Sequence, residues 1–254
     1  MAKGRIPVAL QLYTVRDDAA KDFIGTLKRV AAMGYAGVEL AGTGGLSAHE
    51  MKTVLGDLGL RCVGSHIRLP LLENELPAQL DYYATLGNSY IILPMAPREF
   101  YGSEESLMNL GARLNKIAAA CRARGLAFAY HNHDIEFRRI GERYILDIIM
   151  DSTDPALVKS ELDVYWATYA GADPAAWMQK HPGRCPLVHL KDMAPGPERT
   201  FAEVGEGVID FKPIFALCEA QGTEWYVVEQ DHCARPALES AALSLRHLRE
   251  WAIA

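Results

Sequence analysis

The sequence predicts an α/β protein built as a single (β/α)8 TIM barrel over residues 1–254. Strand-like and helix-like segments alternate from one end to the other without a break in composition, which is typical of a parallel sheet covered by helices. The chain has 254 residues, and about 250 is the usual size of such a barrel. No GxGxxG motif follows the first strand-like segment, which disfavours an open dinucleotide-binding sheet.

Eight short segments rich in β-branched and other apolar residues predict the strands. They are residues 6–13, 37–40, 61–66, 89–93, 127–133, 158–163, 187–191 and 225–229. Apolar residues at helical spacing predict helices between them. These cover residues 17–33, a segment from 47, 76–86, 103–124, 144–150, a segment from 173, 210–221 and 236–251. Residues 194–207 are predicted to be a loop, long enough to serve as an active-site flap.

Several helix ends carry residues that favour a start or a stop. Gly34 and Gly125 each follow the last apolar residue of a helical segment, where a glycine is the usual terminator. Ser47, Asp173 and Asp210 each precede a helical segment and have side chains that accept hydrogen bonds from free backbone N–H groups. These signals support the alternation of strand and helix.

Composition restricts the classes of function. The net charge of -6 argues against a nucleic-acid-binding surface, because phosphate contacts need clustered Lys and Arg. The apolar run near the N-terminus is interrupted by Pro7 and Gln11, so we expect no signal peptide, and no apolar stretch is long enough to span a bilayer. The five cysteines form no CxxC pair, and we expect reduced, mostly buried thiols in a cytoplasmic protein.

Four predicted strands end in side chains that can bind a metal: His131, Asp163, His189 and Glu229. The C-terminal ends of parallel barrel strands meet at one mouth, so these residues are expected to lie close together. A mixed set of nitrogen and oxygen ligands suits a divalent cation. Each residue alone has a structural alternative, a helix cap for the aspartate or a hydrogen-bonded core position for a histidine. Their coincidence across several strands favours the metal site.

Two further residues at this mouth are candidates for catalysis beside Glu229. His133 lies two residues beyond His131 on the same face of the strand, where substrate would lie. Either imidazole can act as an acid or a base, and the sequence leaves open which of them binds the metal. Lys191 is expected to stabilise negative charge on the substrate, with a salt bridge to Glu161 or Asp192 as the alternative.

Other polar residues are expected to bind substrate or to fill the barrel. Glu39 and His66 end predicted strands, and they are expected either to contact substrate hydroxyls or to close a polar layer. Trp166 is predicted to form a wall for a sugar ring, with ordinary packing as the alternative. Glu161 lies one inward step below the mouth, and we expect a buried carboxylate paired with a lysine such as Lys159.

Five motifs in order along the chain resemble a known family: YHNHDIEF, ELDVYW, HLKDM, EVGEGVIDF and VVEQD. Together they resemble the sugar phosphate isomerase/epimerase group of the xylose-isomerase-like, or endonuclease IV-like, barrel superfamily. The resemblance implies one divalent ion at the barrel mouth, Mn2+ or Zn2+ first, with Mg2+, Co2+ or Fe2+ as alternatives. By position, its ligands fall on Asp163, His189 and Glu229. His131 stands where ketose 3-epimerases and hydroxypyruvate isomerases carry a glutamate.

The residues and the resemblance together predict a divalent-metal-dependent sugar isomerase or epimerase of carbohydrate metabolism. Glu229, His131 or His133 would remove a proton next to a carbonyl and leave an enediolate. The alternative is a dehydratase or lyase of an inosose or a 3-keto-glycoside. An endonuclease IV-like nuclease and a non-catalytic sugar-binding barrel are disfavoured. The expected partner is a sugar or polyol, with no nucleic acid and no membrane. Members of the group are frequently dimers or tetramers, so a homo-oligomer is compatible with the resemblance.

Overall fold

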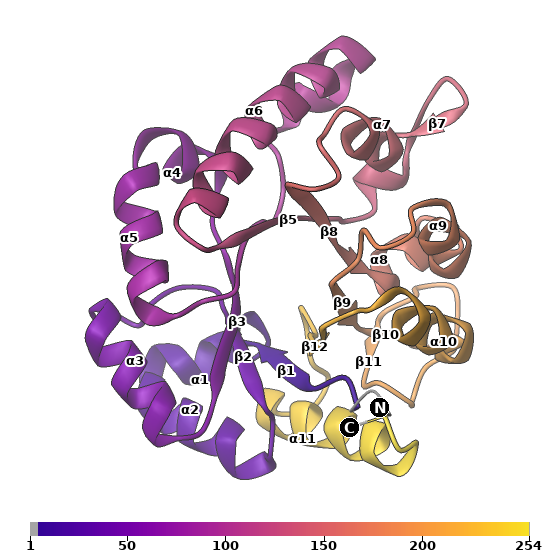
Figure 1. Ribbon diagram of the computed structural model, residues 1–254. Coiled ribbons are helices and arrows are strands. Elements are labelled where there is room, and N and C mark those ends of the chain that lie inside the picture. Colours follow the sequence, from indigo (N-terminus) through magenta and orange to yellow (C-terminus); the bar gives the residue numbers. More distant parts are fainter. Residues whose placement is uncertain (1–4, 254) are drawn as a thin grey trace.

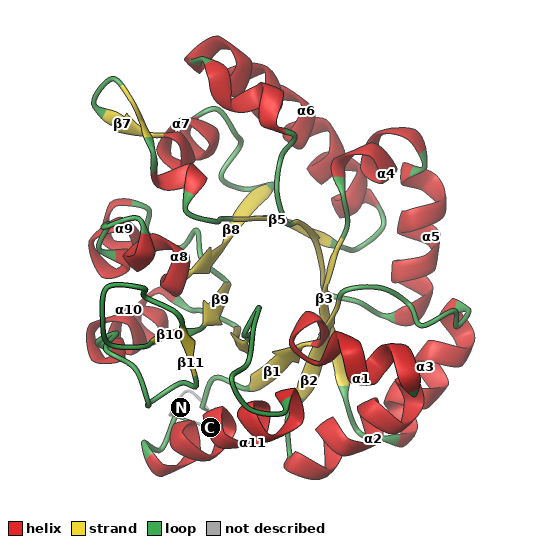
Figure 2. Ribbon diagram, turned by 180° about the vertical axis from the view of Figure 1, so that it is seen from behind, coloured by secondary structure: helices red, strands yellow, loops and turns green. Residues whose placement is uncertain are grey.

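The computed structural model describes residues 5–253 and confirms the predicted fold class, because eight parallel strands close into a barrel. Figure 1 shows the ring of strands surrounded by helices, and Figure 2 shows the same arrangement from behind. In chain order the barrel strands are β1 (Val8–Gln11), β2 (Gly37–Leu40), β3 (Arg61–His66), β4 (Tyr90–Leu93), β5 (Ala127–His131), β8 (Val158–Asp163), β9 (Leu187–Leu190) and β12 (Trp225–Val228). Pairing of β1 with β12 closes the ring.

Helices and short turns connect the strands and cover the outside of the barrel. The α-helices are α1 (Arg16–Lys21), α2 (Phe23–Met33), α3 (Ala48–Asp57), α4 (Leu69–Asn74), α5 (Leu76–Leu86), α6 (Glu104–Ala123), α7 (Ile145–Asp151), α8 (Val164–Tyr169), α9 (Pro174–Lys180), α10 (Phe211–Gln221) and α11 (Ala237–Glu250). The 3-10 turns are η1 (Leu12–Val15), η2 (Arg98–Gly102) and η3 (Ile135–Phe137). Two hairpins outside the barrel pair β6 (Arg139–Ile140) with β7 (Arg143–Tyr144), and β10 (Asp192–Met193) with β11 (Phe201–Ala202).

The structure differs from the sequence prediction in several elements. The single helix predicted over residues 17–33 is two helices, because Asp22 leaves helical backbone angles and caps α2 by accepting a hydrogen bond from the Gly25 N–H (2.8 Å). Helix α4 and both hairpins were not predicted. Strand β8 ends at Asp163 as expected, but helix α8 starts at once, because Asp163 Oδ1 accepts a hydrogen bond from the Trp166 N–H (3.0 Å).

The segment expected to act as a flap is attached to the rest of the barrel. Its strand β11 pairs antiparallel with β10. The Asp192 carboxylate accepts hydrogen bonds from the backbone N–H groups of Gly205 and Gly207, both at 3.0 Å. A Cβ on Gly207 would lie 2.2 Å from Asp192 Oδ1, so this approach requires glycine. The Val204 N–H donates to Ser244 Oγ on α11 (3.1 Å), which fixes the far half of the segment.

The barrel interior has an apolar floor with a polar layer above it. The floor is formed by Ala9, Val63, Tyr90, Ile92, Ala129, Leu187, Trp225 and Val227. Two residues further along their strands, the inward positions become polar: His131 follows Ala129, and His189 follows Leu187. Gly64 gives this layer room, because a Cβ there would lie 2.7 Å from Glu39 Oε2. Strand alternation thus confines the polar interior to the C-terminal mouth.

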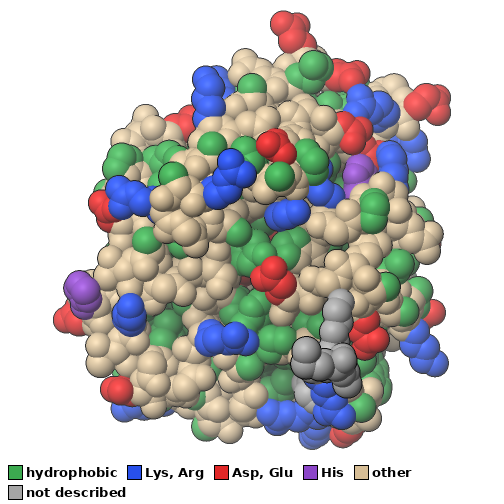
Figure 3. Space-filling view, viewed as in Figure 1, with side chains coloured by type: hydrophobic (Ala, Val, Ile, Leu, Met, Phe, Trp, Pro, Cys, Tyr) green, Lys and Arg blue, Asp and Glu red, His purple; other side chains and the backbone are tan. Residues whose placement is uncertain are grey.

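The surface and the thiols agree with the composition. On the face drawn in Figure 3, Lys and Arg side chains are interspersed with Asp and Glu, and hydrophobic side chains gather near the centre. Among residues 5–253, none of the helices combines the length and the apolar character needed to cross a bilayer. The five cysteines are free, and all except the half-buried Cys233 are buried. The stretch expected not to be a signal peptide begins in residues 1–4, outside the described part.

A buried aspartate connects two helices on the side of the barrel. Asp147 of α7 accepts hydrogen bonds from Trp177 Nε1 (3.0 Å) and Lys180 Nζ (2.6 Å) of α9, and lies 2.9 Å from His181 Nε2. Burial alone would raise the pKa of Asp147, but the bonds with His181 and Lys180 lower it from 3.8 to about 2. The carboxylate form therefore stabilises the folded chain.

We expect Asp147→Asn to lower the free energy of unfolding at pH 7 by about 2 kcal/mol, since one pKa unit corresponds to about 1.4 kcal/mol. The folded pKa is depressed, so this stability is present above pH ~4 and is lost as the pH falls towards ~2. Urea unfolding at several pH values measures the difference, with the exposed Asp57→Asn as control. A deficit that stays constant down to pH ~2 would contradict the electrostatic origin.

Candidate metal centre

Four side chains predicted to meet at the barrel mouth lie together in the structure. His131 ends β5, Asp163 ends β8, His189 lies within β9, and Glu229 follows β12. The register places Asp163 beside His189, and His189 beside Val227, two residues before Glu229. One ligand atom from each of the four residues lies within 4.8 Å of all the others, and all four side chains are buried. We call this set the outer group.

The outer group is only partly satisfied by its own contacts. His189 Nδ1 lies 2.9 Å from Glu229 Oε2. Asp163 Oδ2 lies 3.9 Å from His189 Nδ1 and 3.9 Å from His131 Nε2, too far for a hydrogen bond. This oxygen is buried, and its close contact is the ion pair with Lys191 Nζ at 2.9 Å. Burial raises the pKa of Asp163.

Lys191 supplies the positive charge at this mouth. Its side chain is 1% exposed, and Nζ lies 2.9 Å from Asp163, 2.7 Å from Glu229 and 2.7 Å from Asp231. Burial opposes protonation, but the three carboxylates outweigh it and raise the pKa of Lys191 well above its usual value. The alternative salt bridge to Glu161 is absent from the ion pairs of the described residues.

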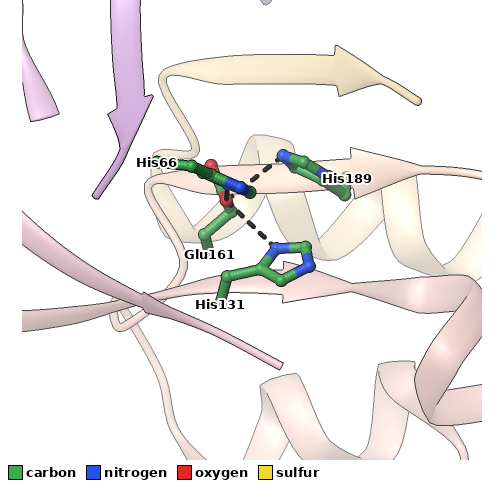
Figure 4. A group of neighbouring side chains, drawn as sticks. All are labelled: His66, His131, Glu161 and His189. Carbon is green, nitrogen blue, oxygen red and sulfur yellow. Dashed lines mark hydrogen bonds and ion pairs between the residues drawn. The ribbon is translucent and has the colours of Figure 1, made fainter. Parts of the chain in front are cut away.

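A second cluster lies next to the outer group and shares two of its residues. It consists of His66, His131, Glu161 and His189, whose ligand atoms also lie within 4.8 Å of one another. Figure 4 shows the three imidazoles around one Glu161 oxygen. Glu161 Oε2 lies 2.9 Å from His66 Nε2, 3.1 Å from His131 Nδ1 and 3.2 Å from His189 Nε2. We call this set the inner group. The expected pairing of Glu161 with a lysine is thus replaced by pairing with histidines.

Glu39 belongs to the same buried layer. It is 0% exposed, and its Oε1 accepts a hydrogen bond from Gln11 Nε2 (2.6 Å) and lies 3.0 Å from His66 and 2.9 Å from His189. Burial alone would raise the pKa of Glu39, but the two histidines lower it well below its usual value. Burial likewise opposes the charge on His66, yet Glu39 and Glu161 raise its pKa to about 10. The carboxylate of Glu39 lies beneath the histidines, which agrees with the alternative that Glu39 closes a polar layer in the barrel.

A cavity of about 570 Å³ opens above both groups. Its lining includes His66, His131, His133, Glu229, Asp231 and Arg68. Trp166 is not part of that lining. Its ring lies behind His133, with centroids 5.5 Å apart, and Lys191 Nζ lies 5.5 Å from the Trp166 centroid. The cavity therefore presents three imidazoles and two carboxylates to a bound molecule, with one arginine at its wall. Sequence reasoning missed Arg68 because nothing local distinguishes it from a surface arginine.

His133 has a ring nitrogen without a protein partner. Its Nδ1 is buried and makes no hydrogen bond, while burial and then Lys191 lower the pKa of the imidazole to about 3. The backbone N–H of His133 donates to Glu136 Oε2 (2.8 Å). Glu136 is itself buried and accepts hydrogen bonds from the hydroxyls of Tyr101 (2.5 Å) and Tyr130 (2.8 Å). Glu136 therefore holds the strand end in place and is not at the mouth.

The outer group fits a divalent cation by its chemistry. It offers two imidazole nitrogens and two carboxylate groups, a donor set suited to Mn2+ or Zn2+. Asp163 Oδ2 and Glu229 Oε2 lie 2.9 and 2.7 Å from the Lys191 ammonium, so both oxygens already face a position where positive charge is stabilised. The described residues thus fit the ion that the family resemblance implies, although they do not identify the metal.

Comparison with known proteins supports the resemblance seen in the sequence. Residues 27–251 match the family model of the xylose isomerase-like TIM barrel. The inosose dehydratase of Clostridium beijerinckii is 26% identical over 210 residues, which cover 70% of each chain. That of Geobacillus kaustophilus is 28% identical over 247 residues, or 81% of this chain and 79% of the relative. For the Clostridium perfringens inosose dehydratases the match spans 59% of the relative's length.

Solved structures agree with the family model. A sugar phosphate isomerase/epimerase from Parabacteroides distasonis superposes with a TM-score of 0.84 at 27% identity, covering 98% of this chain and 95% of that one. An L-ribulose 3-epimerase superposes with a TM-score of 0.74 at 14% identity, over 97% of this chain and 94% of that one. The second likeness shows the shared fold alone.

We expect Lys191→Met to lower the free energy of unfolding by about 3–5 kcal/mol in metal-free protein, because three carboxylates lose their shared cation. Added Mn2+ should restore more of the melting temperature in this variant than in the wild type, since it would replace the lost charge. Thermal melts with and without Mn2+ measure both effects. The exposed Lys28→Met is the control, and an equal loss in both variants would show that the buried ammonium is not required.

Proposed function

This chain belongs to the xylose isomerase-like TIM barrel family, and from that premise we propose that it is a metal-dependent dehydratase of an inosose or a related keto-sugar. The enzyme would remove a proton next to the carbonyl group and then eliminate a neighbouring hydroxyl as water. The inosose dehydratases among its relatives support this reaction class. The observation on the chain itself that carries the proposal is that His133 lines the cavity next to the outer group without belonging to it.

The acid and base groups favour elimination over a two-base epimerisation. Epimerisation between opposed faces needs two exchangeable bases, and the family resemblance places a glutamate on strand five for one of them. Here that place is taken by His131, which faces the carboxylates of Glu161 and Asp163. Glu229 is held by His189 and Lys191. His133 lines the cavity and belongs to neither group, and one residue can both accept and return a proton.

The outer group would hold the divalent ion, which as a Lewis acid polarises the substrate carbonyl and acidifies the adjacent C–H bond. His133 takes the proton from that carbon. Lys191 stabilises the negative charge that develops on the substrate oxygen, because its ammonium lies among the carboxylates at the mouth. The C–O bond of the neighbouring hydroxyl then breaks, and the proton on His133 passes to the departing oxygen, which leaves as water. His133 returns to its neutral state, so no other reactant is consumed.

Isomerisation or epimerisation of a sugar is the second candidate. It is supported by the likeness to the Parabacteroides distasonis sugar phosphate isomerase/epimerase, which covers nearly the whole of both chains. Both reactions begin with the same proton removal and differ in where the proton returns.

The homo-oligomer, the cytoplasmic location and the absence of nucleic acid as a partner stay predictions from the sequence. Abasic-DNA cleavage, or sugar binding without turnover, would favour the two disfavoured functions instead.

We expect turnover of an inosose to stop when EDTA removes bound metal and to return with Mn2+ or Zn2+. Loss of water is followed by mass spectrometry on a panel of inososes, 3-keto sugars and ketoses, with metal content measured in parallel. Dehydration of one panel member is the expected result. Interconversion of ketoses without loss of water would favour the isomerase. Full activity in protein verified as metal-free would contradict both the dehydratase and the isomerase proposals.

We expect His133→Gln to lower kcat by about 10²- to 10⁴-fold, which is the usual contribution of a general acid or base. The melting temperature and the bound metal should stay unchanged, because the His133 side chain makes no hydrogen bond through Nδ1 and is outside both groups. Exchange of the substrate C–H proton with deuterated solvent should fall by a similar factor. The exposed His49→Gln is the matched control. Exchange at the wild-type rate in the His133 variant would assign the base elsewhere.

A further inference from the structure

The inner group contains more nitrogen donors around one oxygen than hydrogen bonding explains. Glu161 Oε2 has imidazole nitrogens of His66, His131 and His189 within 2.9–3.2 Å. Hydrogen bonds join this oxygen to His66 Nε2 and His131 Nδ1, and His189 Nε2, which bonds Glu39 Oε1, lies beside it as a third nitrogen. Three ring nitrogens thus share an oxygen that offers about two lone-pair sites. Meanwhile Glu161 Oε1 is buried without a hydrogen-bond partner. One oxygen is oversupplied with donors while the other has none.

The neighbouring carboxylate shows the same imbalance. Glu39 Oε1 has Gln11, His66 and His189 within 2.6–3.0 Å, whereas Glu39 Oε2 is buried and has no hydrogen-bond partner. Both glutamates are 0% exposed. Burying a carboxylate is costly unless a positive charge compensates it. In the described residues, the ion pairs of Glu39 and Glu161 are made with histidines alone, in contrast to the lysine at the outer group.

We propose that the inner group is a second divalent-cation site, held by His66, His131, Glu161 and His189 with Glu39 beside it. Three imidazoles and a carboxylate form a nitrogen-rich set that suits Zn2+ or a similar borderline ion. The ion would enter from the cavity, because His66 lines it and keeps 14% of its side chain exposed. The site shares residues with the outer group but does not depend on the proposed dehydration.

The two groups use opposite nitrogens of the shared rings. His131 directs Nδ1 to Glu161 and Nε2 to Asp163. His189 directs Nε2 to Glu39 and Glu161, and Nδ1 to Glu229 and Asp163. A neutral imidazole has one lone pair and one N–H, so each ring serves one group as a ligand and donates to a carboxylate of the other. A metal bound to one nitrogen of a shared ring therefore fixes the N–H on the other nitrogen. That nitrogen then donates to the other group and cannot act as a metal ligand there.

The residues that are not shared allow the groups to be tested separately. Asp163→Asn with Glu229→Gln removes the carboxylates of the outer group, and His66→Asn with Glu161→Gln removes two ligands of the inner group. Zn2+ affinity is measured by competition with a chelator, and the ion is located by anomalous scattering from crystals of the whole protein. We expect the outer double variant to keep one Zn2+ per chain, located between His66 and Glu161. Adding the inner substitutions should weaken its affinity by about 100-fold or more, since even indirect partners of a ligand change affinity by about 10–100-fold.

A Zn2+-free outer variant that melts as a folded protein would overturn the proposal, as would crystals of the wild type and of the outer variant that show no anomalous peak between His66 and Glu161. If the outer variant fails to fold, the inner site is tested with Glu161→Gln alone, by its Zn2+ affinity, and with the anomalous map of the wild type. An unchanged Zn2+ affinity in Glu161→Gln, with no peak near His66, rejects the inner site. The proposed function is contradicted by a different result, namely turnover by the wild type without bound metal. The position of the ion tests the inner site and does not test that function.

Discussion

The compensation of buried negative charge is the constraint on which the interior of this barrel depends. Glu39, Glu161, Asp163 and Glu229 are between 0 and 5% exposed, in a region where an uncompensated carboxylate is costly. Three histidines and one lysine lie among them at 2.7–3.2 Å. His66, His189 and Lys191, whose pKa values the carboxylates raise, supply the positive charge. The apolar floor below excludes water from one side, so these groups must satisfy one another or a bound ion.

The sequence was sufficient for the barrel and for the outer group. Strand ends in a parallel barrel meet at one mouth whatever the detail of the register, so His131, Asp163, His189 and Glu229 could be placed together from strand positions alone. The depth of other residues depends on how neighbouring strands are staggered. The register of β2 against β3 shifts between Val38 and Glu39, and this irregularity sets Glu39 opposite Gly64. No pattern within β2 predicts that shift, which is why the sequence left open whether Glu39 contacts substrate or closes a polar layer.

Local competition between elements explains the other differences from the sequence prediction. Residues 17–33 have a helical pattern throughout, but the side chain of Asp22 satisfies a backbone N–H better at a new helix start than in a helix interior. Likewise the apolar residues after Asp163 are compatible with a strand or a helix. The helix α8 forms because Asp163 caps its first turn. The same carboxylate thus ends a strand, starts a helix with Oδ1, and pairs through Oδ2 with Lys191 at the mouth of the barrel.

The attachment of residues 203–209 by Asp192 has a consequence for how molecules reach the interior. Its carboxylate is engaged by backbone N–H groups on both sides of Glu206, and α11 anchors the preceding residue. Opening this segment would expose a buried charge and break several bonds at once. This side of the barrel therefore stays shut, and a molecule that reaches the interior comes through the cavity on the side of His66, Arg68 and Met95.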